Sequence, residues 1–201
     1  MSRIQTYSGA LTAEQFLFYE IRIASRFYLD GASLDDAAAK IQEQNLFQYP
    51  TEREVKRMTR ACYKRLDALE NHELIKELSS APAEIAKQIN LYAMMRYNLL
   101  VWDFMVQLIG EKYKSQDMSL TPKDMNGFFA RMQAQSDQIA GWSDKTIKKI
   151  RGVLLRALTE TGYIDTVRST VLNPVFISQE LEDGIRENGD SQALAAFNCF
   201  R

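Results

Sequence analysis

Apolar residues recur along most of the chain at the spacing of amphipathic helices. In "AEQFLFYEIRIASRFYLD", residues 13–30, one face passes through Leu17, Ile21, Ala24 and Tyr28, as on the buried side of a helix. Residues 51–69 and 143–161 have comparable apolar seams. Most of the chain is therefore expected to be helical.

One segment, "IAKQINLYAMMRYNLLVWDFMVQLIG", residues 85–110, is apolar on nearly every side. Lys87, Arg96 and Asp103 interrupt it, whereas a membrane-spanning helix needs about 20 nearly uncharged residues. The pattern predicts a single buried central helix and no membrane segment.

Helix-start and helix-stop signals divide the chain. Capping boxes are expected where Thr12 precedes Gln15 and where Thr51 precedes Glu54. Glycines suited to a helix end follow two of the apolar seams. The other expected start residues are Ser33, Asn71, Pro82, Pro122, Ser143 and Ser178, and the expected stop residues are Gly31 and Gly162.

Residues 163–177, "YIDTVRSTVLNPVFI", have a different pattern. They are rich in β-branched residues and contain the turn pair Asn173-Pro174, which predicts a short hairpin or an extended arm. We therefore predict an all-α fold: a compact helical bundle with a C-terminal helix-turn-helix or winged-helix-like part and at most one small hairpin. Apolar periodicity lapses at residues 114–122, so subdomains are expected at residues 1–118 and 119–201.

Charge is segregated along the chain. The net charge is −1, so any affinity for nucleic acid must come from clustered charge. On a helix over residues 51–69, basic side chains lie opposite the seam within about 60°, and acidic residues before Asp67 are confined to the first turn. The basic residues of this stripe are Arg53, Arg57, Arg60 and Lys64, with Lys56 beside them.

The helix expected from Ser143 repeats this design. From Lys145 to Arg156 there are five basic residues and no acidic one: Lys145, Lys148, Lys149, Arg151 and Arg156. This helix follows another helix and a tight segment, and a possible hairpin comes after it, which is compatible with a helix-turn-helix unit. Either stripe alone is equally typical of a solvated helix face. Two stripes in a nearly neutral chain favour binding to a polyanion or to an acidic protein surface.

Residues suited to catalysis or metal binding are sparse. His72 is the one histidine, and the chain has no phosphate-binding loop, dinucleotide fingerprint, HExxH or GxSxG motif. Cys62 and Cys199 are far apart, without a metal-binding pattern, and the N-terminal residues have no apolar run typical of a signal peptide. We expect an intracellular protein that is not an enzyme and holds no metal or cofactor.

Four segments together resemble the BrxA family of bacteriophage-exclusion (BREX) defence systems. They are "SGALTAEQFLFYEIRIASRFYLDG", "IQEQNLFQYPTEREVKRMTRACYKRLDAL", "RYNLLVWDFMVQLIGEKY" and "TIKKIRGVLLRALTETGYI". The resemblance, from Tyr7 to Ile164, implies a small, cytoplasmic, all-helical, non-enzymatic phage-defence component able to bind DNA. The family is also similar in fold to the RNA-binding antitermination factor NusB.

Three functions stay open at this point. The first is largely sequence-independent binding of double-stranded DNA, with the basic faces on phosphates. The second is RNA binding, with Tyr49 and Tyr63 as candidates for stacking on bases. The third is an adaptor that docks on other BREX proteins through an exposed apolar patch.

Overall fold

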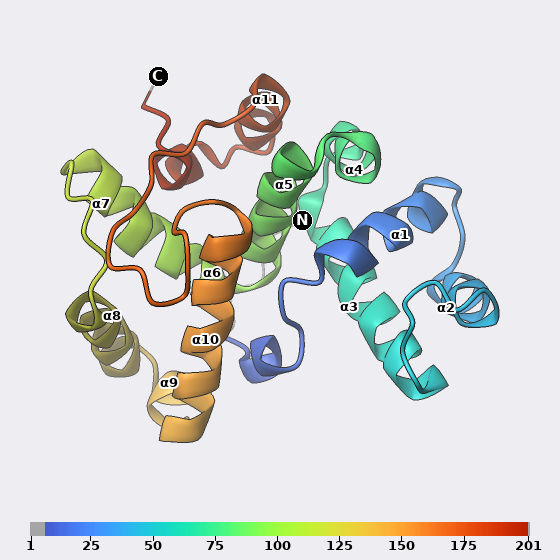
Figure 1. Ribbon diagram of the computed structural model, residues 1–201, viewed down its shortest axis with the longest axis horizontal. Helices are drawn as coiled ribbons and strands as arrows, with labels where there is room; N and C mark the ends of the chain where they lie inside the picture. Colours follow the sequence, from blue (N-terminus) through green and yellow to red (C-terminus); the bar gives the residue numbers. More distant parts are fainter. Residues whose placement is uncertain (1–6, 201) are drawn as a thin grey trace.

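The computed structural model describes residues 7–200, and Figure 1 shows them as a bundle of short and medium-length helices. Within this range no strand is present, and the sole β-type pairing is an antiparallel bridge between Ser119 and Val171. The predicted all-α class is confirmed.

The N-terminal helices surround α3. They are α1 (Phe18–Leu29), α2 (Leu34–Glu43), α3 (Glu52–Leu69), α4 (His72–Ser80) and α5 (Ala83–Tyr97). Helix α3 packs against α1, α2, α4 and α5. The predicted caps Ser33, Thr51 and Asn71 each accept a hydrogen bond from the backbone N–H three residues later, so these three boundaries are confirmed.

The first predicted helix begins later than expected. Residues Gly9–Thr12 form a 3₁₀ helix, and Thr12 donates its hydroxyl to the Gly9 carbonyl instead of capping a helix at Ala13. The chain is then non-helical until α1 begins at Phe18. The expected capping box of Thr12 and Gln15 is therefore wrong. The cause lies in α3, because Arg65 engages the backbone carbonyls of residues 14–16 and holds them away from helical bonding.

The predicted central helix is also divided. Helix α5 ends at Tyr97, and Asn98 adopts an extended conformation whose side chain caps α6 (Leu99–Phe104) by accepting from the Leu100 N–H. A π-helix, Met105–Gly110, and α7 (Glu111–Lys114) follow. Burial on nearly all sides was predicted correctly, but a single continuous helix was wrong, because the side chain of Asn98 competes for backbone hydrogen bonds.

The C-terminal part begins with α8 (Pro122–Gln135), α9 (Asp137–Ala140) and α10 (Asp144–Glu160). This order suits a helix-turn-helix, which stays a prediction. Residues 163–177 form an extended arm without a hairpin of their own, so no wing is present in this described segment. The arm pairs with the predicted subdomain break instead: Leu120 N–H donates to Thr170, and Leu172 N–H donates to Met118.

The C-terminal residues dock on the N-terminal helices. Helix α11 (Gln179–Glu187) leads to a 3₁₀ helix, Ser191–Phe197, whose apolar side chains are buried. The Arg96 guanidinium on α5 donates to the Asp190 carboxylate at 2.9 Å and also pairs with Glu70 after α3. This network ties the C-terminal residues and the end of α3 to α5.

Candidate nucleic-acid interface

Helix α3 presents its basic stripe on the side opposite its packing. Val55, Met58, Cys62 and Leu66 are buried, each with 4% or less of its surface exposed. The predicted basic residues are all exposed: Arg53, Lys56, Arg57, Arg60 and Lys64. The structure thus brings the five predicted side chains together on one face of one helix.

Within this stripe, one side chain has an ion-pair partner. Lys56 Nζ lies 2.8 Å from the Asp35 carboxylate of α2. The hydrogen bond from Lys56, helped by the charge of Arg60, lowers the pKa of Asp35. Among the described residues, the other four side chains of the stripe have no hydrogen-bond or ion-pair partner, so they are available to a ligand: Arg53, Arg57, Arg60 and Lys64.

The basic residues of α10 fall into two groups. Lys145, Lys148 and Lys149 are exposed and have no polar partner in residues 7–200. Arg151 is half-buried, donates to the Asn126 side chain of α8, and places its guanidinium 5.8 Å from the ring centroid of Phe129. Arg156 is exposed and donates to the Gln15 side chain at 3.0 Å. The lysines therefore resemble the α3 stripe, whereas both arginines are engaged in the structure.

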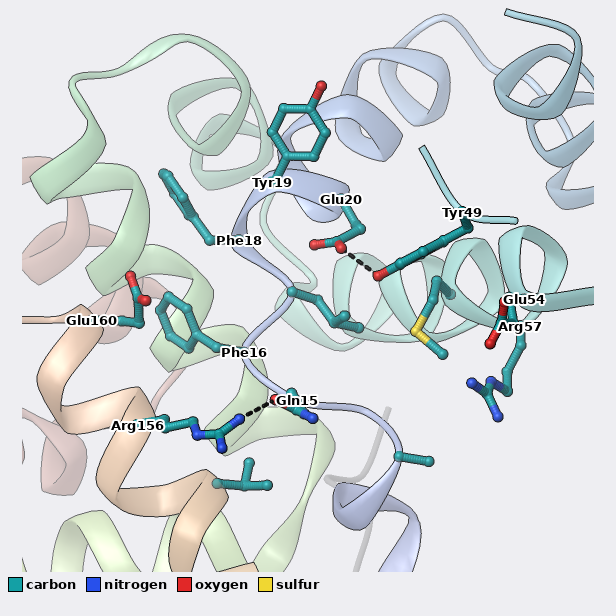
Figure 2. A pocket seen from close by; sticks show the side chains of 14 residues that line it. Gln15, Phe16, Phe18, Tyr19, Glu20, Tyr49, Glu54, Arg57, Arg156 and Glu160 are labelled. Atoms are coloured by element: carbon teal, nitrogen blue, oxygen red, sulfur yellow. Dashed lines mark hydrogen bonds between the residues drawn. The ribbon is translucent and has the colours of Figure 1, made fainter. Parts of the chain in front are cut away.

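A groove lies between the two basic helices (Figure 2). Its volume is about 620 Å³, and Arg57 of α3 and Arg156 of α10 both line it. In Figure 2 these two arginines stand on opposite sides, with the residues around the start of α1 between them. The groove is the place where the two helices contribute basic side chains to one concave surface.

Aromatic side chains line the same groove. Phe16 is buried, Phe18 and Tyr49 are half-buried, and Tyr19 is 55% exposed. The rings of Phe16 and Phe18 are stacked with their centroids 6.4 Å apart. Tyr19 belongs to the first turn of α1 and is the most exposed aromatic residue of the groove.

Three carboxylates also line the groove, each engaged by a neighbour. Glu20 accepts a hydrogen bond from the Tyr49 hydroxyl, whose pKa is raised by burial and by this bond. Glu160 pairs with Lys87 at 2.9 Å, and Glu54 accepts from the Thr51 hydroxyl at 3.1 Å. The groove is mixed in charge, in contrast to the basic stripe beside it.

The two tyrosines proposed as stacking residues differ in accessibility. Tyr63 is 7% exposed, donates its hydroxyl to the Ala32 carbonyl at 3.0 Å and meets the Tyr28 ring edge-on. It is a core residue and unsuitable for stacking, so that candidate was wrong. Tyr49 lines the groove. Sequence reasoning missed Tyr19, although its position off the Leu17–Ile21–Ala24 seam is a usable signal.

No helix in residues 7–200 has both the length and the apolarity needed to cross a membrane. The same range contains no group of three or more His, Cys, Asp or Glu side chains placed to hold a metal ion. The polar side chains gathered at the groove are basic, acidic and aromatic, with the amide of Gln15 and without a histidine or cysteine among them.

Fold and surface together define an all-helical protein that presents two basic helix faces beside one groove. A family model described as BrxA matches residues 5–189. The chain belongs to the BrxA family, and so to the BREX phage-defence systems.

Individual relatives agree with this assignment. The "BREX protein BrxA" of Bacillus cereus (strain H3081.97) is 29% identical over 191 residues, covering 94% of this chain and 95% of the relative. The protein of the same name from Escherichia coli O9:H4 (strain HS) is 23% identical over 193 residues, covering 95% and 89%. A crystal structure of an uncharacterized protein from Magnetospirillum magneticum has the same fold, with a TM-score of 0.81 at 21% identity, covering 95% of this chain and 97% of that one.

Proposed function

We propose that this BrxA-family protein binds double-stranded DNA through phosphate contacts and acts without catalysis of its own. The observation that supports this proposal is a set of exposed cationic side chains with no partner among the described residues, on two helices that flank one groove: Arg53, Arg57, Arg60 and Lys64 on α3, and Lys145, Lys148 and Lys149 on α10. Unpaired surface cations in a chain of net charge −1 are expected of a polyanion-binding surface.

The proposed binding is largely independent of sequence. Contacts to phosphates fix the position of a protein on the duplex, whereas contacts to base edges specify a sequence. The α3 stripe consists of Arg and Lys on the surface of a helix that packs on four neighbours. A helix packed in this way can lie along a phosphate backbone more readily than it can enter the major groove.

The test is a double substitution, Arg57→Gln with Arg60→Gln, in titrations with duplex DNA over a range of salt concentrations. Each lost phosphate contact lowers the slope of log affinity against log salt by about 0.9, so we expect a slope smaller by about 1.8. The loss should be equal for unrelated duplex sequences, and thermal unfolding should stay unchanged. An unaltered affinity and slope would show that the stripe is only a solvated face.

A second candidate, RNA binding, is favoured by one observation. Tyr19, which is 55% exposed and lines the same groove as Arg57 and Arg156, is suited to stacking on unpaired bases. Titrations with duplex DNA, single-stranded DNA, duplex RNA and single-stranded RNA of equal length, at two salt concentrations, separate the two candidates. Tightest binding to RNA would favour the second.

An adaptor role, with other BREX proteins as partners, has its own supporting feature. Phe176 on the extended arm is 84% exposed, and Val171 nearby in the chain is 59% exposed. If docking through the arm is the main role, Phe176→Ala abolishes co-purification with a BREX partner, while the α3 double variant leaves it unchanged.

A further inference from the structure

The groove between α3 and α10 differs chemically from the basic faces on either side of it. Arg57 and Arg156 are its two basic lining residues, whereas Glu20, Glu54 and Glu160 contribute three carboxylates. A phosphate backbone lying inside the groove would meet these carboxylates and be repelled. An uncharged ring would not, and the aromatic side chains of the groove would provide it with flat surfaces.

We propose that this groove receives an unpaired nucleobase of bound DNA, with the phosphates on either side of that base contacting Arg57 and Arg156. This inference rests on the proposed DNA binding and names the form of DNA that the site prefers: a duplex interrupted by an unpaired nucleotide. Such a nucleotide swings out of the stack at lower cost than a paired one.

The groove is suited to a base in size and in surface. Its volume of about 620 Å³ lies within the range of about 300–1,000 Å³ typical of small-molecule pockets. Tyr19 is exposed enough to stack, and Phe18 beside it is half-buried. Arginine side chains add cation–π contacts to such a platform. Figure 2 shows Arg57 and Arg156 on opposite sides of the groove, and Arg156, which donates one N–H to Gln15, keeps its other donors for a phosphate.

The carboxylates have a role in this arrangement. Glu160 uses one oxygen for Lys87, and Glu54 uses one for Thr51. Because a carboxylate has two oxygens, each can accept a further hydrogen bond from an amino group on a base edge, as Glu does from the cytosine amino group. Engagement by Lys87 and Thr51 holds the two side chains at the wall of the groove.

The experiment compares two probes, a fully paired duplex and the same duplex with one bulged cytosine. The protein should bind the bulged probe about tenfold more tightly. Tyr19→Ala should remove this preference, because stacking on one aromatic ring is worth about 1–3 kcal/mol, which is roughly five- to 150-fold in affinity. The ring carries no charge, so the salt slope should not change. Tyr19→Phe keeps a ring and should keep the preference.

Phe176→Ala is the matched control, since it deletes an exposed aromatic ring that does not line the groove. It should leave the preference intact, and circular dichroism confirms that each variant is folded. Equal affinity of the parent for the two probes would overturn this inference while leaving duplex binding established. Absence of binding to either probe would overturn both. Loss of preference with Phe176→Ala as well as Tyr19→Ala would also refute a role for the groove.

Discussion

Helices α3 and α10 share an amphipathic design but use their basic residues differently. On α3 the five residues of the stripe are exposed and one of them, Lys56, is ion-paired within the described part of the chain. On α10 the three lysines are exposed, while Arg151 is engaged by Asn126 and Phe129, and Arg156 by Gln15. A basic face read from sequence can therefore combine residues available to a ligand with residues that hold neighbouring elements.

The sharpest contrast lies within α3 itself. Arg65 follows Lys64 directly, yet it is 1% exposed and donates to the carbonyls of Phe16 at 2.9 Å and Glu14 at 2.7 Å. Burial lowers the pKa of this guanidinium. The same type of side chain thus serves the fold on one side of the helix and the surface on the other.

The largest effect that we predict comes from Arg65→Met. The carbonyls of Glu14 and Gln15 lose their charged donor, while the Phe16 carbonyl keeps the hydrogen bond from the Asn90 side chain, and each buried acceptor left without a partner costs about 1–3 kcal/mol. We expect the free energy of unfolding to fall by about 3 kcal/mol, which lowers the melting temperature by roughly 6–12 °C for a protein of this size. Thermal unfolding followed by circular dichroism measures the shift.

Arg60→Met is the control for this prediction, because it makes the same substitution on the exposed side of the same helix. Its unfolding free energy should change by about 0.5 kcal/mol or less, while its DNA affinity falls. Equal melting temperatures for the two variants would contradict the structural role assigned to Arg65.

Most of the fold follows from local sequence signals. Thr51, Asn71 and Ser143 cap helices by bonds to N–H groups three residues away, so nearby residues suffice to predict these boundaries. The start of α1 could not be predicted from nearby residues, because Arg65, distant in sequence, holds residues 14–16 out of a helix. The break at Asn98 could not be predicted either, because the apolar pattern on both sides continues without interruption.

The candidate site was likewise predictable from the sequence only in part. Helical periodicity predicted which basic residues of α3 share a face, and all of them are exposed. The groove could not be predicted, since Arg57 and Arg156 come to line one groove only through tertiary packing of α1 and of the 3₁₀ helix Gly9–Thr12, against which α10 packs. Tyr63 was misassigned because periodicity does not show that α1 and α2 cover that side of α3.

The next prediction tests whether the lysines of α10 contact DNA phosphates as the α3 stripe is proposed to do. Replacing Lys145, Lys148 and Lys149 by Gln should lower the salt slope for duplex DNA by about 2.7, if each contacts one phosphate. Stability should change little, because the three side chains have no polar partner in residues 7–200. Titrations at several salt concentrations measure the slope.

A triple variant with Lys40, Lys123 and Arg168 changed to Gln is the matched control. It makes the same change in net charge at exposed side chains that also have no polar partner in residues 7–200, and none of them lines the groove. Its slope should stay close to that of the parent. An equal loss in both triple variants would mean that overall charge, rather than the α10 face, determines binding.

The smallest predicted effect concerns the one paired member of the α3 stripe. Asp35 neutralises Lys56 at 2.8 Å, and its pKa is lowered by Lys56 and Arg60. Asp35→Asn frees the lysine and removes a negative charge beside the stripe. Because exposed ion pairs are worth about 0.2–1 kcal/mol, duplex affinity in low salt should rise by roughly 1.4- to fivefold.

This gain should disappear in high salt, since screening weakens exposed charges first, and most of it should depend on Lys56. In the double variant with Lys56→Gln, the loss of Asp35 still removes a negative charge that repels DNA phosphates near Arg60. A smaller gain in affinity is therefore expected. Glu180→Gln on α11, which makes the same charge change away from the groove lining, should have no effect. If Asp35→Asn weakens binding instead, then α2 contacts the DNA itself and the binding surface is wider than the α3 stripe.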